Sequence, residues 1–172
     1  DALPICYNTR NIDKPYAEET DMGSYFMLHM LDKIKPGGFM CVIVPPSIVS
    51  GSNMKRLRLR LSRKAEFLGA HRLPTGTFDA NGTSTVVDVV LMRKHPAEMA
   101  EKIPLVDEST LESANVLWPT FISGKWFEKD GRRFVHGTQE KGFQGRIEVR
   151  ADGQIDNKAL KANLINRFES RI

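Results

Sequence analysis

GGFMCVIVPPSIVSG, residues 37–51, is the stretch that decides the fold. Six consecutive apolar residues, 39–44, follow a glycine pair and run directly into Pro45-Pro46. A short continuous apolar run is typical of a β-strand that other elements cover on both faces. Proline has no N–H to donate to a sheet, so the proline pair should end the strand. We therefore predict a buried strand at 39–44 and interpret Pro45-Pro46 as its terminator.

The residues around this strand predict two helices and two further strands. Apolar residues recur at helical spacing in 23–35, and a second amphipathic helix is expected at 54–67. Strands are expected at 67–74 and 84–94, where β-branched and other apolar residues are frequent. A long loop rich in Gly, Asn and Thr joins these two strands, so we predict a hairpin. The order of helix, strand, helix and strand hairpin predicts an α/β fold.

The character of the sequence changes at His95-Pro96, which we take as a boundary. Residues 1–95 would form the α/β domain, and residues 96–172 a linker followed by a small α+β appendage. Turn residues within 118–154 separate short apolar segments, which predicts short strands there. The aromatic residues of this stretch alternate with Lys and Arg. They either form a small core or stack on single-stranded nucleic acid.

The chain has 172 residues and a net charge of +4, and all of the basic excess lies in its first half. Residues 1–94 hold 13 Lys or Arg against 9 Asp or Glu, whereas residues 95–172 hold 12 of each. The expected second helix carries six basic residues and no acidic one: Lys55, Arg56, Arg58, Arg60, Arg63 and Lys64. These side chains could bind DNA phosphates. Alternatively, they form a solvated helix face above a buried leucine seam.

Several classes of protein are disfavoured by the sequence. It has no signal peptide and no apolar run of about 18 residues, so we expect neither export nor a membrane partner. The two cysteines, Cys6 and Cys41, are far apart, which favours a reducing, bacterial-type cytoplasm over a disulfide framework. The four histidines show no spacing typical of a metal site, and we predict none.

Four short motifs follow one another in a fixed order: Lys35-Pro36-Gly37-Gly38, Val44-Pro45-Pro46-Ser47, Leu73-Pro74-x-Gly76-x-Phe78, and Thr85 through Asp88 to Arg93-Lys94. This ordered set, over about residues 20–94, resembles the second half of the catalytic domain of adenine-N6 DNA methyltransferases. More narrowly, it is similar to the methylase module of the large, antirestriction-type methyltransferase–helicase polypeptides of phages, plasmids and genomic islands. The resemblance implies a partial Rossmann-like methyltransferase sheet with a small β-rich C-terminal appendage.

The resemblance also implies a function for the full-length protein. That function is transfer of a methyl group from S-adenosylmethionine to a flipped adenine in DNA. The implied partners are DNA and the remainder of the same polypeptide, namely an N-terminal methyltransferase half and a helicase domain. The family's glycine-rich cofactor turn has no match before residue 20. We therefore expect this chain not to bind S-adenosylmethionine tightly and to be inactive alone.

The family's catalytic tetrad, a polar residue, two prolines and an aromatic residue, has no intact match. The tetrad orients the target amino group and stacks on the flipped base. Val44-Pro45-Pro46-Ser47 lacks both chemical ends, because valine offers no acceptor and serine no aromatic face. Asn8 follows the apolar segment 3–7 and is one candidate for the tetrad position. Asp13 and Tyr16, which flank Lys14-Pro15, are the second candidate for the tetrad. A third interpretation is that neither segment holds the tetrad and that both are loops.

Two further residues have alternative interpretations. Phe78, in the loop between the hairpin strands, would either stack in the target-base pocket or plug the core. Asp88 interrupts a β-branched strand, which an exposed alternating position explains most simply. Two rival functions remain. One is a non-catalytic DNA-binding or scaffold module of methylase ancestry, and the other an unrelated α/β domain for assembly with other subunits.

Overall fold

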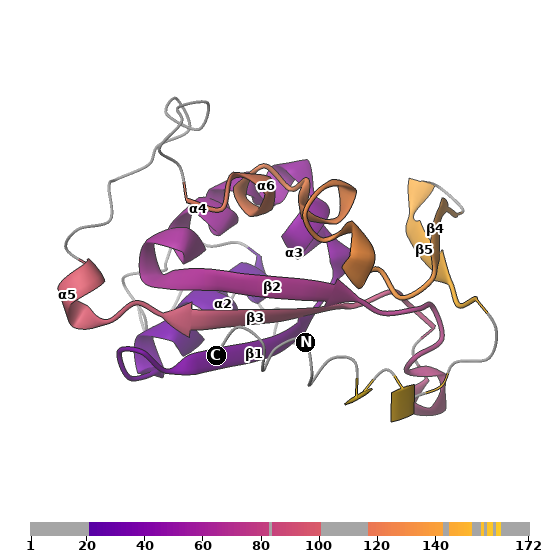
Figure 1. Ribbon diagram of the computed structural model, residues 1–172, viewed down its shortest axis with the longest axis horizontal. Helices are drawn as coiled ribbons and strands as arrows, with labels where there is room; N and C mark the ends of the chain where they lie inside the picture. The colour runs from indigo at the N-terminus through magenta and orange to yellow at the C-terminus, as the bar shows by residue number, and fades with distance from the viewer. Residues whose placement is uncertain are drawn as a thin grey trace, which may run out of the picture.

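A computed structural model describes residues 21–82, 84–100, 117–142 and 145–152, together with 156, 158–159 and 161–162 (Figure 1). The helices are α2 (Met22–Lys33), α3 (Pro46–Ser50), α4 (Lys55–Lys64), α5 (Ala97–Ala100) and α6 (Pro119–Ile122). The strands are β1 (Phe39–Val44), β2 (Ala65–Arg72), β3 (Asp88–Lys94), β4 (Thr138–Lys141) and β5 (Ile147–Arg150). Short 3-10 helices are η2 (Ser52–Met54), η3 (Asp79–Asn81), η5 (Trp126–Glu128) and η6 (Arg132–Phe134). The described fold is mixed α/β.

Three strands form the main sheet in the order β1-β3-β2, and β3 runs antiparallel to both neighbours. The predicted hairpin of β2 and β3 is confirmed. Because β3 opposes both outer strands, β1 and β2 run parallel to each other. The chain crosses from β1 to β2 through α3 and α4, as parallel strands require. β4 and β5 form a separate antiparallel pair.

Helices α2 and α4 cover one face of this sheet and contact each other. Lys64 Nζ of α4 donates to Asp32 Oδ1 of α2 at 2.6 Å. Asp21 caps α2, because its carboxylate accepts from the Ser24 N–H at 2.6 Å. The core between the helices and the sheet includes Leu28, Leu31, Met40, Val44, Leu57, Leu61, Ala70, Val90 and Met92.

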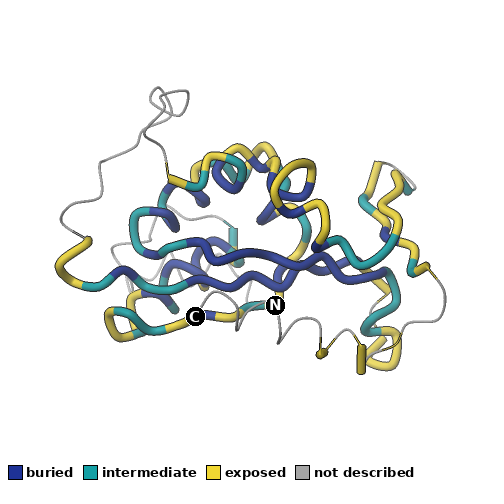
Figure 2. Tube along the Cα trace, viewed as in Figure 1, coloured by how far each residue is buried: buried dark blue, intermediate teal, exposed yellow. Residues whose placement is uncertain are grey.

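The opposite face of β1 is not covered, which corrects the prediction of a strand buried on both faces. Burial alternates along β1, and Phe39 and Ile43 remain 44% and 59% exposed. Cys41, between them, is also exposed. Exposed stretches recur along β1 in the tube coloured by burial (Figure 2). Met40 and Val44 point into the core below the helices, whereas Phe39, Cys41 and Ile43 point away from it, because successive side chains of a strand alternate between its two faces.

The proline pair ends β1 as predicted. The strand stops at Val44, Pro45 is the N-cap residue of α3, and Pro46 occupies its first turn, where a missing N–H costs nothing. The second helix is shorter than predicted. α4 ends at Lys64, and β2 starts directly at Ala65, so residues 65–67 are strand rather than helix.

The tail differs more strongly from its prediction. Residues 119–134 form α6, η5 and η6 instead of short strands, and the strands among the described residues of the tail are β4 and β5. The tail aromatics belong to the same core as the main sheet. Phe121 stacks on Phe67 of β2 with a centroid distance of 3.9 Å, and Trp126 donates its indole N–H to the Ala70 carbonyl. Side chains on both sides of residue 95 therefore share one core.

Candidate functional site

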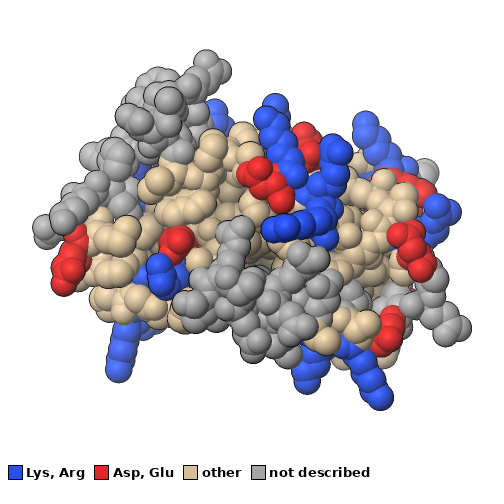
Figure 3. Space-filling view, in the orientation of Figure 1, with Lys and Arg blue, Asp and Glu red and all other residues tan. Residues whose placement is uncertain are grey.

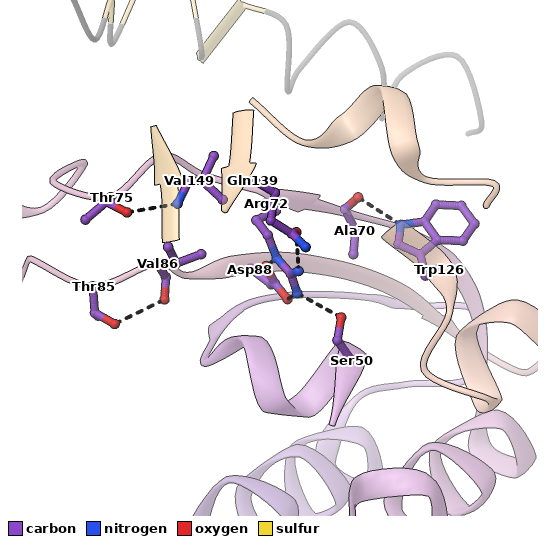
Figure 4. A network of polar contacts seen from close by, with 10 residues as sticks. All are labelled: Ser50, Ala70, Arg72, Thr75, Thr85, Val86, Asp88, Trp126, Gln139 and Val149. Atoms are coloured by element: carbon purple, nitrogen blue, oxygen red, sulfur yellow. Dashed lines mark hydrogen bonds and ion pairs between the residues drawn. The ribbon is translucent and has the colours of Figure 1, made fainter. Parts of the chain in front are cut away.

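The carboxyl ends of β1 and β2 meet at one edge of the sheet, where α/β folds gather their ligands. The start of α3, the loop 73–87 and the first residue of β3 lie at this edge. The polar side chains drawn together there are centred on Arg72 and Asp88 (Figure 4). This group of side chains is the candidate site.

Arg72 and Asp88 form a buried, two-pronged ion pair. Arg72 Nε and Nη2 donate to the two carboxylate oxygens of Asp88, each at 2.8 Å. The side chains are 1% and 0% exposed. The interpretation of Asp88 as an exposed alternating residue is therefore wrong. Arg72, the last residue of β2, pairs with Asp88, the first residue of β3, and both side chains lie on the face of the sheet that the helices cover.

The rest of the Arg72 guanidinium links three further elements. Its Nη2 also donates to Ser50 Oγ at the end of α3 at 2.9 Å, and its Nη1 donates to Gln139 Oε1 on β4 at 2.8 Å. The centroid of the Phe127 ring lies 4.2 Å from the guanidinium carbon of Arg72. Burial raises the pKa of Asp88, while the hydrogen bonds and charge of Arg72 oppose that rise. This network holds the edge of the sheet in place.

A pair of histidines lies beside this network. His71 Nδ1 is 2.9 Å from His136 Nε2, so one ring donates and the other accepts. The two rings are stacked, and the ring of Phe134 lies against His71. The pair could not be found in the sequence, because 65 residues separate its members.

Phe78 lies in the loop between β2 and β3, directly before η3. It is half-buried and packs against a small cluster formed by Leu73, Val87 and Val89. This packing agrees with the interpretation of Phe78 as a residue that plugs the core. Stacking of Phe78 on a target base stays a prediction.

The structure separates one basic residue of α4 from the other five. Arg58 is fully buried, and its Nη1 donates to the carbonyls of Ile48 and Gly51 at 3.0 and 2.8 Å. Its Nε donates to the Ile122 carbonyl at 3.0 Å. The expectation that Arg58 binds DNA phosphates is therefore wrong for this fold, because its guanidinium joins α4 to α3 and α6. Burial lowers the pKa of Arg58 to about 10, so it stays charged at neutral pH.

The other basic residues of α4 remain at or near the surface. Arg56 is exposed, whereas the remaining four are half-buried: Lys55, Arg60, Arg63 and Lys64. The neighbouring tail adds four exposed basic residues, Lys125, Lys129, Arg132 and Arg133. Acidic side chains lie among the basic ones in this part of the surface (Figure 3). The surface is thus mixed in charge, and its binding to DNA stays a prediction.

Three predicted site residues, Asn8, Asp13 and Tyr16, lie outside the described residues. Among the residues that are described, no three His, Cys, Asp or Glu side chains are grouped to hold a metal ion. The same residues contain no helix long and apolar enough to cross a membrane.

Two carboxylates at this edge of the sheet, Asp79 and Asp88, bear on whether S-adenosylmethionine could bind here. A carboxylate at this edge of the sheet would have to be available to the ribose hydroxyls. Asp88 has both oxygens bonded to Arg72, and exposed Asp79 accepts from Ser84 Oγ. Asp88 is therefore not available to a ribose.

Comparison with known proteins identifies the class to which this α/β fragment belongs. The N-6 DNA methylase family model matches residues 5–135, and the chain belongs to that family. The chain is also 96% identical over 165 residues to a protein of Escherichia phage P1 named "Defense against restriction protein B". That alignment covers 96% of this chain but only 7% of the phage protein. No solved structure matches.

Proposed function

We propose that this chain is one part of the methyl-transfer domain of a much longer polypeptide. The whole polypeptide would transfer the methyl group of S-adenosylmethionine to the N6 amino group of adenine in DNA. The family match over residues 5–135 carries this proposal. The name of the phage relative supports it, because methylated adenines protect DNA from endonucleases that cut only unmethylated sites.

The sheet supports the proposal at the level of architecture. Parallel strands β1 and β2, joined by a helical crossover, together with α2 and α4 on one face, would form one side of a Rossmann-like methyltransferase sheet. In this proposal, the Arg72–Asp88 pair has a structural role. It fixes the edge of the sheet from which residues of the loop 73–87 would face the target base.

DNA would contact the outer face of α4 in this arrangement. Arg56 and the solvent-facing parts of Arg60 and Lys55 would bind phosphates, while Arg58 holds the helix in place from within. The phosphate contacts would position the duplex and carry no sequence information.

The chain alone would lack methyltransferase activity. Isothermal titration of S-adenosylmethionine into the purified chain tests this, with circular dichroism to show that the protein is folded. We expect no heat of binding and no labelled-methyl transfer to DNA. The full-length polypeptide should show both. Binding or transfer by the isolated chain would contradict the proposal of an incomplete site.

Two results together would favour a different function. They are salt-dependent binding of DNA by the folded chain and no methyltransferase activity of the full-length polypeptide. This combination would point to a non-catalytic DNA-binding or scaffold module of methylase ancestry. The observation behind this alternative is that Val44-Pro45-Pro46-Ser47 lacks both chemical ends of the family's tetrad.

A further inference from the structure

The β4–β5 hairpin has few buried residues of its own. All four residues of β4 are exposed, and Val149 is the buried residue of β5. A two-stranded hairpin by itself is at best marginally stable in water, so its position depends on the residues that anchor it. These anchors lie at the end of β2 and at the start of the loop 73–87.

Thr75 and Val149 form hydrogen bonds with each other in both directions. The Thr75 N–H donates to the Val149 carbonyl at 2.8 Å, and the Val149 N–H donates to Thr75 Oγ1 at 3.0 Å (Figure 4). Val149 stands opposite Gln139 in the hairpin, and Gln139 Oε1 accepts from Arg72 Nη1 at 2.8 Å. One cross-strand pair of the hairpin therefore holds both anchors.

The chain enters the hairpin beside the same arginine. Val135 forms a parallel bridge with Arg72, and the His136 N–H donates to the Arg72 carbonyl at 2.9 Å. Gly137 then leads into β4 with a φ of 140°, and a Cβ at this position would overlap the Arg150 carbonyl oxygen. Residues 135–137 thus pack the hairpin closely against the end of β2.

After Thr75, the printed backbone turns of the loop are local. Thr77 Oγ1 donates to the Pro74 carbonyl at 2.7 Å, and the Asp79 N–H donates to the Gly76 carbonyl at 3.1 Å. Residues 79–82, 84 and 85 are exposed. Local turns fix the shape of a loop but not the direction in which it leaves the sheet. The bonds between Thr75 and the hairpin supply part of that direction.

We propose that the β4–β5 hairpin is a positioning element of the methyl-transfer site and that Thr75 is the positioning residue through which it acts. The hairpin fixes the direction of the loop 73–87, and the loop presents its polar residues to the target base. The consequence for the target base rests on the proposed function. The holding of the loop by the hairpin does not depend on methyl transfer.

Thr75→Val tests the holding of the loop, because it removes the hydroxyl that accepts from Val149 and keeps the shape of the side chain. Hydrogen exchange of the purified chain is followed by NMR, residue by residue, and corrected for intrinsic rates. The N–H of residue 75 keeps its acceptor, the Val149 carbonyl, so its exchange reports release of the hairpin and not the bond removed. We expect this exchange to become about two- to tenfold faster, with β3 unchanged.

Thr77→Val is the matched control, since its hydroxyl lies in the same loop but bonds to Pro74 and not to the hairpin. It should leave the exchange of residue 75 unchanged, and Thr75→Ser, which keeps the hydroxyl, should behave like the native chain. Unchanged exchange at residue 75 in Thr75→Val would overturn the proposal. So would an equal acceleration in Thr77→Val, or an acceleration throughout β3, which would mean that Thr75 supports the whole fold.

The full-length polypeptide tests the consequence for the target base. A residue that only positions the loop should change kcat and leave the binding of the cofactor as it was. We expect Thr75→Val to lower kcat for methyl transfer about tenfold with the same KM for S-adenosylmethionine, and Thr75→Ser to recover kcat. An unchanged kcat would overturn the role in the site. A native polypeptide without activity would instead contradict the proposed function, and hydrogen exchange would still decide whether the hairpin holds the loop.

Discussion

Replacing Arg58 with methionine should destabilise the fold strongly while leaving its surface unchanged. Arg58 is the buried cation of α4, and its guanidinium donates to three backbone carbonyls, those of Ile48, Gly51 and Ile122. Methionine has a similar length and fills similar space, but it donates nothing. The Arg58→Met variant would leave these buried carbonyls without that donor.

The magnitude follows from two opposing contributions. Hydrogen bonds to a charged group contribute about 1.5–3 kcal/mol each, so three of them amount to about 6 kcal/mol. Burial lowers the pKa of Arg58 to about 10, which corresponds to a cost of about 3 kcal/mol for keeping the charge in the folded state. The difference predicts a loss of about 3 kcal/mol for Arg58→Met. In a protein of this size the melting temperature would fall by about 6–12 °C.

Urea unfolding, followed by circular dichroism, measures this loss. Arg56→Met is the matched control, since Arg56 lies two residues earlier in α4 and is exposed. Its effect on the free energy of unfolding should stay within about 0.5 kcal/mol. If Arg58→Met costs less than about 1 kcal/mol, the buried guanidinium is not a net stabiliser, and the reasoning from its three hydrogen bonds is refuted.

Three further predictions concern other parts of the molecule. Asp88→Asn should lower the free energy of unfolding in urea by about 3–5 kcal/mol, because Arg72 keeps its buried charge without a charged partner. The double variant Asp88→Leu/Arg72→Met should regain most of this loss, because it removes both buried charges. Gly131→Ala should lower stability by about 1–3 kcal/mol and shift the fluorescence of Trp126, because the added methyl group would overlap its indole; an unchanged spectrum would contradict this packing. If α4 binds DNA, Arg56→Gln should reduce the slope of log affinity against log salt by about 1, whereas an unchanged slope would exclude that phosphate contact.

Much of the main sheet could be predicted from local patterns. The apolar run at 39–44 and the proline pair after it define β1 and its end, because a strand cannot extend through residues without an N–H. Helical spacing located α2, and the β-branched run at 84–94 located β3. These elements follow from residues close together in the chain, which is why the sequence alone was sufficient.

The candidate site depends on contacts between distant residues, and the sequence gives little sign of them. Arg58 belongs to a run of six basic residues, and nothing in that run marks it as the buried one. The helical spacing of Leu57 and Leu61 places Arg58 next to the apolar seam, and this is the one available signal. The partner of Asp88 is 16 residues away, at the end of β2 and on the other side of the intervening loop. A charge within a β-branched strand indicates only that some partner exists.

The difference between the sequence and the structure at β1 is informative in itself. Six apolar residues in a row predict burial on both faces, and the described structure buries one. An exposed edge of this composition is unfavourable in water, at about 25 cal/mol for each Å² of apolar surface, and it invites pairing with other chains. The chain corresponds to 7% of its phage relative, so most of that polypeptide lies outside this sequence. If the rest of a longer polypeptide covers this face of β1, Cys41 should lose its reactivity toward maleimide in the full-length protein.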